Sequence, residues 1–505
     1  MLKTIAALSA LTLCIAGKAD ASCFVQNEAV SGATEKVLRN EDITSDIPPA
    51  APIKVTGNGA NQPVFYDNDF VYLRSALDSQ NDQRDLHSRI TDKWKGLQLA
   101  PSIYLDLGGE FRTRFQNDNG GALNQLNGLD NSVFLTRLRG YANLELGPHL
   151  RVFVELIDAR VFGVDTLGQL PVAEAELDLR NAFAELTWPV ADGEVYFRGG
   201  QQELLFGGQR FVTPLDWANS RRTFRGVRAG YRSNEWDLSL WRTRPQLTNG
   251  VFDTAISDDS IFSGGYATYR GLEHTTLDLY VFNLENDEDL GIDFDIWTIG
   301  THGAGRVQNF LWEIETALQT GEQESAQTGE PLDFKSYSIT AGIGLDTKDT
   351  VPLLNNVWLY YDRAQGDGDP DDDTVRTFNQ LFPLAHAYFG HNDLVGRRNI
   401  EALSVRASFT PINRIGVSMG VHRFWRESAG DALFNAGGVG IRVPLDGSRS
   451  IGSEIDIDVS YALTQRTTLG AGFSKFFGGA FVEAGSDTDD ANNPDFSYVQ
   501  LQIRF

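Results

Sequence analysis

Tyr498-Val-Gln-Leu-Gln-Ile-Arg-Phe505 ends the chain with a strict alternation of apolar and polar side chains. The apolar set is Val499, Leu501, Ile503 and Phe505. Because successive side chains of a strand point to opposite faces, the segment has one apolar and one polar side. A soluble sandwich could use it as an edge strand. A transmembrane barrel would use it as the closing strand, with lipid outside and water inside.

The same alternation recurs through the chain. In Ile103 to Phe115, apolar residues alternate with Asp106, Glu110, Arg112 and Arg114. Segments of this kind have about the 9–11 residues that a tilted strand needs to cross a bilayer. We predict eighteen strands, at 103–115, 133–146, 149–160, 177–188, 194–202, 224–232, 235–244, 261–270, 274–284, 294–302, 307–320, 335–346, 355–363, 399–410, 414–425, 453–462, 467–477 and 496–505.

The connections between these segments alternate in length. Short turns, such as Gly147-Pro148 and His302–Arg306, alternate with long polar stretches such as 364–398 and 426–452. Outer-membrane barrels have short periplasmic turns and long outer loops, so the pattern predicts an all-β, antiparallel transmembrane barrel. An even strand count requires Gly438 to Val443 to form a hairpin within its loop. A soluble protein of several sandwiches is the alternative, but it does not predict this alternation.

The N-terminus has the features of a secretory signal over residues 1–21. Lys3 precedes an apolar stretch, and Ala19-Asp-Ala21 fits the cleavage rule. Residues 22–100 are predicted to form an N-terminal periplasmic segment, with a short helix near Arg74–Trp94, and 101–505 the barrel. Cleavage would leave Cys23 as a lone thiol.

Composition narrows the functional classes. The chain has 43 basic and 68 acidic residues and a net charge of −25, which argues against nucleic acid as a partner. After the signal, no apolar run approaches the ~18 residues of a transmembrane helix. Among the basic residues only nine are lysines, so arginine predominates.

Arginines occupy many inward strand positions and one unusual loop. The loop 203–223 is apolar and aromatic, so we expect it to fold into the mouth or lumen of the barrel and narrow the pore. Because guanidinium groups pair bidentately with carboxylates, arginine rows would attract an anionic solute. The predicted pore-lining, solute-binding residues are Arg112, Arg114, Arg137, Arg139, Arg151, Arg198, Arg210, Arg221, Arg222, Arg225, Arg228 and Arg406. Alternatively, they pair with inward Asp106, Glu110, Glu145 and Glu155 in a structural ladder.

Other chemistry has weaker support. Acidic loops at 285–293, 367–373 and 487–490 could bind Ca²⁺ weakly, but none matches an EF-hand, and no His or Cys spacing indicates a metal site. We expect no cofactor. Gly416-Val-Ser-Met-Gly420 matches the nucleophile-elbow string, with His422 nearby, yet it lies within an alternating strand instead of a strand–turn–helix. An outer-membrane lipase-type enzyme is therefore a remote alternative, and we expect no enzyme.

Three stretches resemble the alginate export family of outer-membrane barrels. They are Tyr66–Tyr72 with Leu107–Arg114, Gly200–Arg210 with Asp216–Arg228, and Phe382–Leu394 with Asn399-Ile400. The chain departs from the family pattern at Gln201 and Arg225, which puts the solute in question more than the fold.

The resemblance implies an outer-membrane pore that passes an anionic polysaccharide or oligosaccharide, such as an alginate-like polyuronate, through an Arg-lined channel. The implied partners are this saccharide, outer-membrane lipid and periplasmic export proteins. A general or small-solute porin with different selectivity is the alternative.

Overall fold

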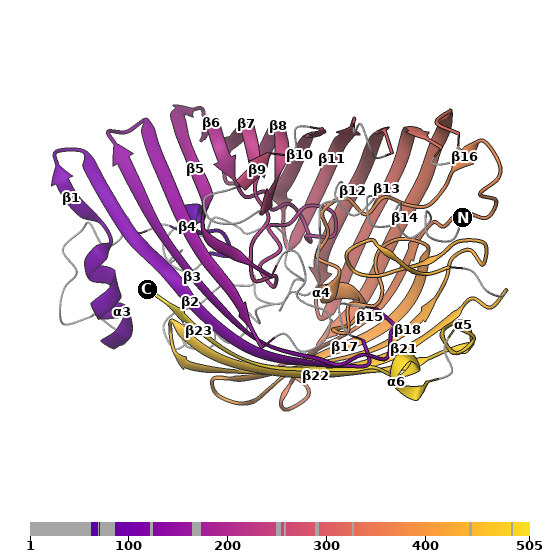
Figure 1. Cartoon of the computed structure of the whole chain (residues 1–505). Coiled ribbons are helices and arrows are strands. Elements are labelled where there is room, and N and C mark those ends of the chain that lie inside the picture. The colour runs from indigo at the N-terminus through magenta and orange to yellow at the C-terminus, as the bar shows by residue number, and fades with distance from the viewer. Residues whose placement is uncertain are drawn as a thin grey trace.

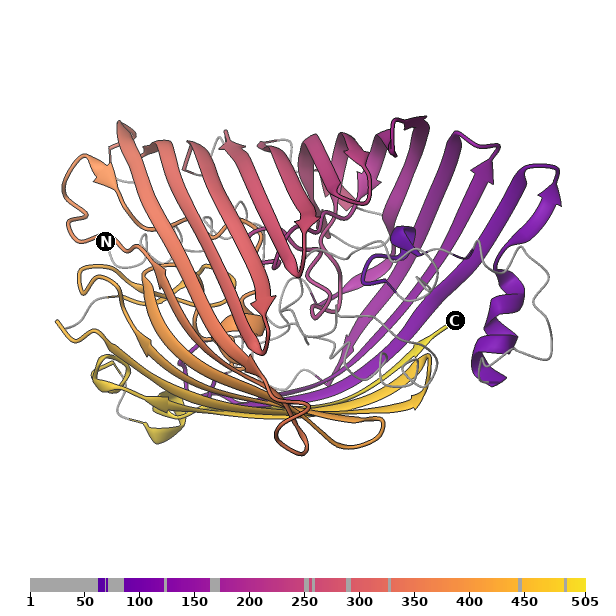
Figure 2. The same ribbon diagram turned by 180° about the vertical axis from the view of Figure 1, so that it is seen from behind.

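The chain forms a β-barrel with its loops folded inward (Figures 1 and 2). A computed structural model describes residues 62–68, 70, 86–121, 125–163, 173–248, 254–256, 259–287, 292–325, 328–443, 447–485 and 488–505. The predicted signal, residues 1–21, and most of the segment 22–100 lie outside these ranges. No helix among the described residues is long and apolar enough to cross a membrane.

Eighteen antiparallel strands make the barrel wall, as predicted. They are β2 (Ile103–Asn119), β3 (Asn131–Leu146), β4 (Leu150–Phe162), β5 (Ala175–Val190), β6 (Gly193–Gln202), β7 (Phe224–Arg232), β8 (Trp236–Thr248), β10 (Ser260–Leu272), β11 (Thr275–Asn286), β12 (Phe294–Val307), β13 (Phe310–Glu324), β14 (Pro331–Asp346), β15 (Leu354–Ala364), β17 (Ile400–Ile412), β18 (Ile415–Trp425), β21 (Ser450–Thr464), β22 (Thr467–Gly478) and β23 (Asp495–Arg504).

The remaining described elements are short. β1 (Leu97–Ala100) extends the sheet beside β2, β9 (Thr254–Ile256) pairs with β8, and β16 (Thr374–Val375) lies parallel to β14. β19 (Leu433–Phe434) and β20 (Gly440–Arg442) form a separate hairpin, which confirms that this segment belongs to a loop. The helices are η2 (Phe65–Asp67), α3 (Leu86–Thr91), η4 (Asp92–Trp94), α4 (His386–Phe389), α5 (Ala480–Glu483) and α6 (Asp489–Asn492).

The C-terminal segment closes the barrel. β23 pairs with β2 from Glu110↔Arg504 to Asn119↔Asp495, and Gly109 and Phe505 exchange two backbone hydrogen bonds of 2.8 and 2.9 Å beyond the last strand residue. The alternation has the predicted outcome, because Val499 is 53% exposed whereas Tyr498, Gln500 and Gln502 are buried. The apolar face therefore points outward and the polar face into the lumen.

The outer wall of the barrel is apolar, as contact with lipid requires. Leu240 on β8, Leu279 on β11 and Leu318 on β13 are 66%, 65% and 65% exposed. Their strand neighbours point inward, where Ser239, Asp278 and Gln319 are buried. A soluble sandwich would not leave such a band of leucines in water.

One predicted turn is wrong. His302–Arg306 lies within β12, and the chain reverses at Gln308–Asn309. Gly303 and Gly305 looked like turn residues, but they make room for a side chain on the next strand. A Cβ atom at Gly305 would lie 2.9 Å from Nε1 of Trp312, and one at Gly303 would lie 3.1 Å from its Cζ3.

The two ends of the barrel differ. At one end, α3 contacts the short turn between β21 and β22, where Ser88 Oγ donates to Gln465 Oε1 at 3.2 Å. The helices α5 and α6 lie in the long connection between β22 and β23, at the other end (Figure 1). This arrangement agrees with short periplasmic turns on the side of α3 and long extracellular loops opposite.

Candidate functional site

The loop 203–223 fills part of the barrel interior. Leu204, Thr213 and Trp217 are all buried, and the loop runs among luminal side chains of the strands. Its backbone is held by arginines of the wall: Arg112 donates to Asp216 O at 2.7 Å and to Ala218 O at 2.9 Å. An apolar, aromatic loop lies here because the barrel shelters its side chains from water.

All twelve predicted site arginines lie within the described residues, nine on strands and three in this loop. Most of them fall into three clusters with different partners. The clusters surround Asp216, Tyr388 and Tyr66, and the last borders a cavity.

The first cluster surrounds Asp216 and fastens the loop to β2 and β3. Arg137 contacts Asp216 Oδ1 at 2.9 Å and Glu110 at 2.5 Å, and Arg221 forms an ion pair with Asp216 as well. Burial alone would raise the pKa of the Asp216 carboxyl, but Arg221 and Arg137 outweigh it and hold that pKa well below its usual range. Asp216 is therefore ionised and ties the loop to the wall.

Arg114 extends this cluster by stacking. Its Cζ lies 3.3 Å from the ring centroid of Trp217, and its Nε donates to Gln500 Oε1 at 2.9 Å. The polar face of the C-terminal strand thus supports the loop through Arg114, and its Tyr498 ring contacts Trp217 directly, with 4.7 Å between the centroids. Cation–π contact with a desolvated tryptophan stabilises such a pair by about 2 kcal/mol.

The second cluster surrounds Tyr388, in the loop 365–399. Arg210 donates to Glu313 at 2.5 Å and to Glu315 at 3.1 Å, while its Cζ lies 4.3 Å from the Tyr388 ring. Arg406 donates to Ala387 O at 2.7 Å and to Tyr388 O at 2.5 Å. These contacts hold a second loop inside the barrel.

The two loops also bond to each other. Thr213 N donates to Phe382 O at 3.1 Å, and Phe382 N donates to Phe211 O at 2.9 Å. Arg222 stacks over Phe382, with 5.2 Å from its Cζ to the ring centroid. Two of the stretches that carry the family resemblance therefore meet in one buried unit inside the barrel.

The third cluster belongs to β3, β4, β6 and β7. Arg139 pairs with Glu155 at 2.6 Å, and Arg151 and Arg198 both pair with Glu185 at 2.6 Å. A carboxylate ladder therefore exists, through Glu110, Glu155 and Glu185. The predicted ladder residue Asp106 instead accepts hydrogen bonds from Gly96 N and Asn143 Nδ2.

The N-terminal segment 62–68 lies inside the barrel against this cluster. Arg151 Nη1 donates to Tyr66 O at 2.7 Å, and Tyr66 donates its hydroxyl hydrogen to Glu203 O. The Tyr66 ring centroid lies 5.2 Å from that of Phe183 and 4.3 Å from Arg198 Cζ. The aromatic pair Phe65-Tyr66 within a polar stretch was the signal for this insertion.

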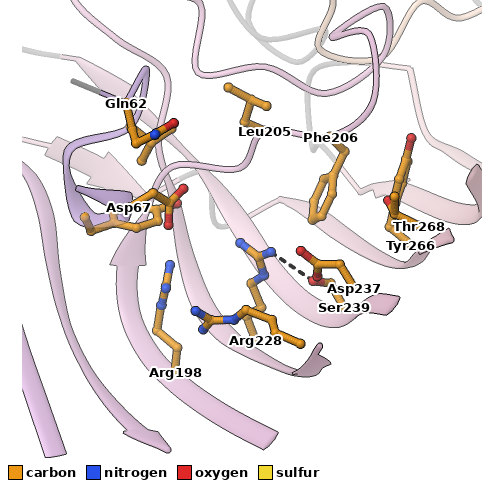
Figure 3. A pocket seen from close by; sticks show the side chains of 13 residues that line it. Gln62, Asp67, Arg198, Leu205, Phe206, Arg228, Asp237, Ser239, Tyr266 and Thr268 are labelled. Atoms are coloured by element: carbon orange, nitrogen blue, oxygen red, sulfur yellow. Dashed lines mark hydrogen bonds between the residues drawn. The ribbon is translucent and has the colours of Figure 1, made fainter. Parts of the chain in front are cut away.

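A cavity opens beside the segment (Figure 3). Cationic side chains, aromatic faces and small polar groups share its wall, with Arg228 Nη2 donating to Ser239 Oγ at 2.9 Å. Among the residues that the structure describes, Arg198 Nη1 and Arg228 Nε have no hydrogen-bond partner. The main lining residues are Asp67, Arg198, Phe206, Arg228, Arg232 and Tyr266. This combination suits a ligand with a carboxylate and a flat apolar face.

Arg232 was missed by the sequence analysis, although the pattern contained it. It lies four residues after Arg228 on β7, on the same strand face. It pairs with Glu185 at 3.2 Å and its Cζ lies 3.9 Å from the Tyr196 ring centroid. Arg225, at the start of β7, donates to Gln201 Oε1 at 3.0 Å and does not line the cavity.

The remaining sequence motifs are the acidic loops and the nucleophile-elbow string around Ser418. In the described residues, no group of three or more His, Cys, Asp or Glu side chains could hold a metal ion. Asp367 and Asp372 accept hydrogen bonds from backbone N–H groups of their own loop. Ser418 lies in the middle of β18, paired with Ser408 and Asp458, so the strand–turn–helix of a nucleophile elbow is missing there.

Comparisons with known proteins agree with this architecture. The family model described as alginate export matches residues 103–494. OccK8 (OprE) of Pseudomonas aeruginosa is 10% identical, covers 79% of this chain and 98% of its own, and has a TM-score of 0.51. The outer membrane protein opdK from Pseudomonas aeruginosa is 14% identical over 79% of this chain and 99% of its own, with a TM-score of 0.50. At these identities the likeness concerns the fold alone. No curated protein sequence matches the chain closely enough to count as a relative.

Proposed function

The chain belongs to the alginate export family, and from this premise we propose that its outer-membrane channel passes an anionic polysaccharide or oligosaccharide, with an alginate-like polyuronate favoured. The observation that carries the proposal is the cavity of Figure 3, where Arg198, Arg228 and Arg232 share a wall with aromatic rings. A uronate residue offers a carboxylate to the guanidinium groups and a ring face to Phe206 and Tyr266.

The mechanism is electrostatic. A guanidinium fork replaces part of the water around a carboxylate and lowers its barrier to entry. Arg198 and Arg232 share one partner, Glu185, which also accepts from Arg151, whereas Arg228 donates to Ser239. Asp67 and Asp237 also line the cavity and the whole chain carries −25, but Nη1 of Arg198 and Nε of Arg228 have no hydrogen-bond partner among the described residues. These unused donors favour an anionic solute at this depth of the lumen.

A small-solute porin is the second candidate. The loops 203–223 and 365–399 and the segment 62–68 occupy the same lumen, and a monomeric acid needs less displacement of them than a polymer does. Export of a polymer would in addition need a periplasmic protein that delivers it, and α3 and η4 lie at the end of the barrel where that protein would bind.

Current block in planar bilayers tests the proposal. A defined mannuronate oligomer should block the current of the purified channel, and Arg228→Gln should weaken the block about tenfold, the loss expected for one charge-assisted contact. Arg242→Gln is the matched control, because Val227 pairs with Arg242 and both side chains point to the outer surface. Block by a monomeric uronate or an aromatic acid, with none by the oligomer, would favour the small-solute porin.

A further inference from the structure

We propose that the segment Gln62–Asn68 is an internal ligand, which occupies the solute-binding site until an acidic sugar residue displaces Tyr66 and Asp67. This inference rests on the proposed function and adds its regulation. It also gives Arg198 a second role, because its guanidinium group lines the cavity and also stacks on the Tyr66 ring.

Arginines donate hydrogen bonds to oxygen atoms of the segment, as they would to the carboxylate of an anionic solute. Arg151 Nη1 donates to Tyr66 O at 2.7 Å, and Arg221 Nη2 donates to Pro63 O at 3.1 Å. Both acceptors are carbonyl oxygens of the segment's backbone. Guanidinium groups bind carboxylate oxygens more strongly than neutral carbonyls, so a uronate would gain at these positions what the segment gives up.

The Tyr66 ring occupies a pocket shaped for a flat six-membered ring. Phe153 and Phe183 meet it edge-on, with centroids at 5.8 and 5.2 Å, and Arg198 Cζ lies 4.3 Å from its centroid. A pyranose ring has a similar thickness and carries its polar groups around the edge. The pocket would therefore accept one sugar residue in place of the tyrosine.

Asp67 supplies the negative charge of the internal ligand. It lines the cavity with Arg198 and Arg228 and faces the same space as they do (Figure 3). Arg198 is buried, yet no described residue forms a hydrogen bond with its Nη1. The segment therefore occupies the site without using every hydrogen-bond donor of Arg198. An anion that uses these donors can displace the segment.

Competition between the segment and the solute raises the apparent dissociation constant of the solute. When the segment occupies the site for most of the time, the apparent dissociation constant of the solute is its intrinsic value divided by the fraction of empty sites. Tyr66→Ala removes the ring contacts and the hydrogen bond to Glu203, so the empty fraction rises. We expect the apparent dissociation constant of a mannuronate oligomer, measured by current block, to fall about tenfold.

A disulfide that holds the segment in the cavity should have the opposite effect on solute binding. Val64 and Leu205 line the same cavity and pack in one cluster, so Val64→Cys with Leu205→Cys, in a Cys23→Ser background, is the pair chosen to join the segment to the loop by a disulfide. The oxidised channel should lose block by the oligomer and conduct less, and a reductant should restore both. Tyr461→Ala, a tyrosine change on the outer face of β21, is the matched control and should leave block unchanged.

The results of these experiments distinguish the internal-ligand inference from the proposed channel function. Tighter block in Tyr66→Ala together with loss of block in the oxidised pair supports the internal ligand. Equal block in the wild type, in Tyr66→Ala and in the oxidised pair leaves the channel function standing and overturns the internal ligand, as does weaker block in Tyr66→Ala. Absence of block in every form contradicts the proposed function itself.

Discussion

Arg210 offers the sharpest test of how the loop 203–223 is held in the lumen. It joins this loop to β13 through Glu313 at 2.5 Å and Glu315 at 3.1 Å, and all three side chains are buried. Arg210→Met keeps most of the side-chain volume but removes the charge. Two buried carboxylates then lose their shared cation, and breaking a buried pair in this way costs about 3–5 kcal/mol.

The structure indicates the lower end of that range. Glu313 keeps hydrogen bonds from Tyr360 at 2.8 Å and a contact with His302 Nε2 at 3.1 Å, so part of its charge stays compensated. A loss of about 3 kcal/mol shifts the equilibrium from the packed to the released loop by roughly a hundredfold, since each 1.4 kcal/mol is a factor of ten. Single-channel recordings should therefore show more time in states of higher conductance.

Two further variants make the result interpretable. Arg210→Met combined with Glu313→Gln and Glu315→Gln removes the unpaired charges and should return the open fraction toward the wild-type value. Arg160→Met breaks an exposed pair with Asp158 and should change nothing measurable. An open fraction in Arg210→Met equal to that of the wild type would refute the role of this ion pair in holding the loop.

Three other predictions follow from local geometry. Burial lowers the pKa of Lys95 to about 7, below that of the free side chain, so the packed state of its segment binds fewer protons than the released state. Packing of the segment should therefore become more stable from about pH 7 to pH 9. Protease cleavage near Lys95 should slow over that interval, and Lys95→Met should abolish this pH dependence. Gly390→Ala should lower stability by about 1–3 kcal/mol in thermal unfolding, because φ is +88° and the new Cβ would lie 2.4 Å from the Glu454 carboxyl; an unchanged midpoint would contradict this close approach. Leu279→Arg places a charge in the lipid-facing band and should cost about 2–4 kcal/mol in folding titrations into bilayers, whereas a neutral result would place β11 elsewhere.

The sequence predicts the wall of the barrel well because strand periodicity is a local property. The alternation in Ile103–Phe115 and in Tyr498–Phe505 places each side chain on its face without knowledge of any other strand, and parity then orders the loops. The misplaced turn at His302–Arg306 has the converse cause. Gly303 and Gly305 accommodate Trp312 across the strand, and a contact between neighbouring strands is invisible in a local reading.

The contacts inside the barrel are harder to predict, because they join residues that are far apart in the sequence. The apolar composition of 203–223 indicated that the loop enters the barrel, and it does. The insertion of Tyr66 depends on a hydrogen bond to a residue 137 positions away, which no window of sequence contains. Which arginines hold loops and which face the cavity also depends on distant carboxylates, so inward Arg112 and Arg228 looked alike in the sequence but have different partners.

The zero-current potential of the purified channel under a salt gradient tests the central claim most directly. The guanidinium groups of Arg198, Arg228 and Arg232 in the cavity wall predict a potential of the sign that marks anion selectivity, and Arg228→Gln should move it toward zero, whereas Arg242→Gln should not. A potential of cation-selective sign in the wild type, unchanged in Arg228→Gln, would contradict the account, because the acidic residues would then set the field along the solute path.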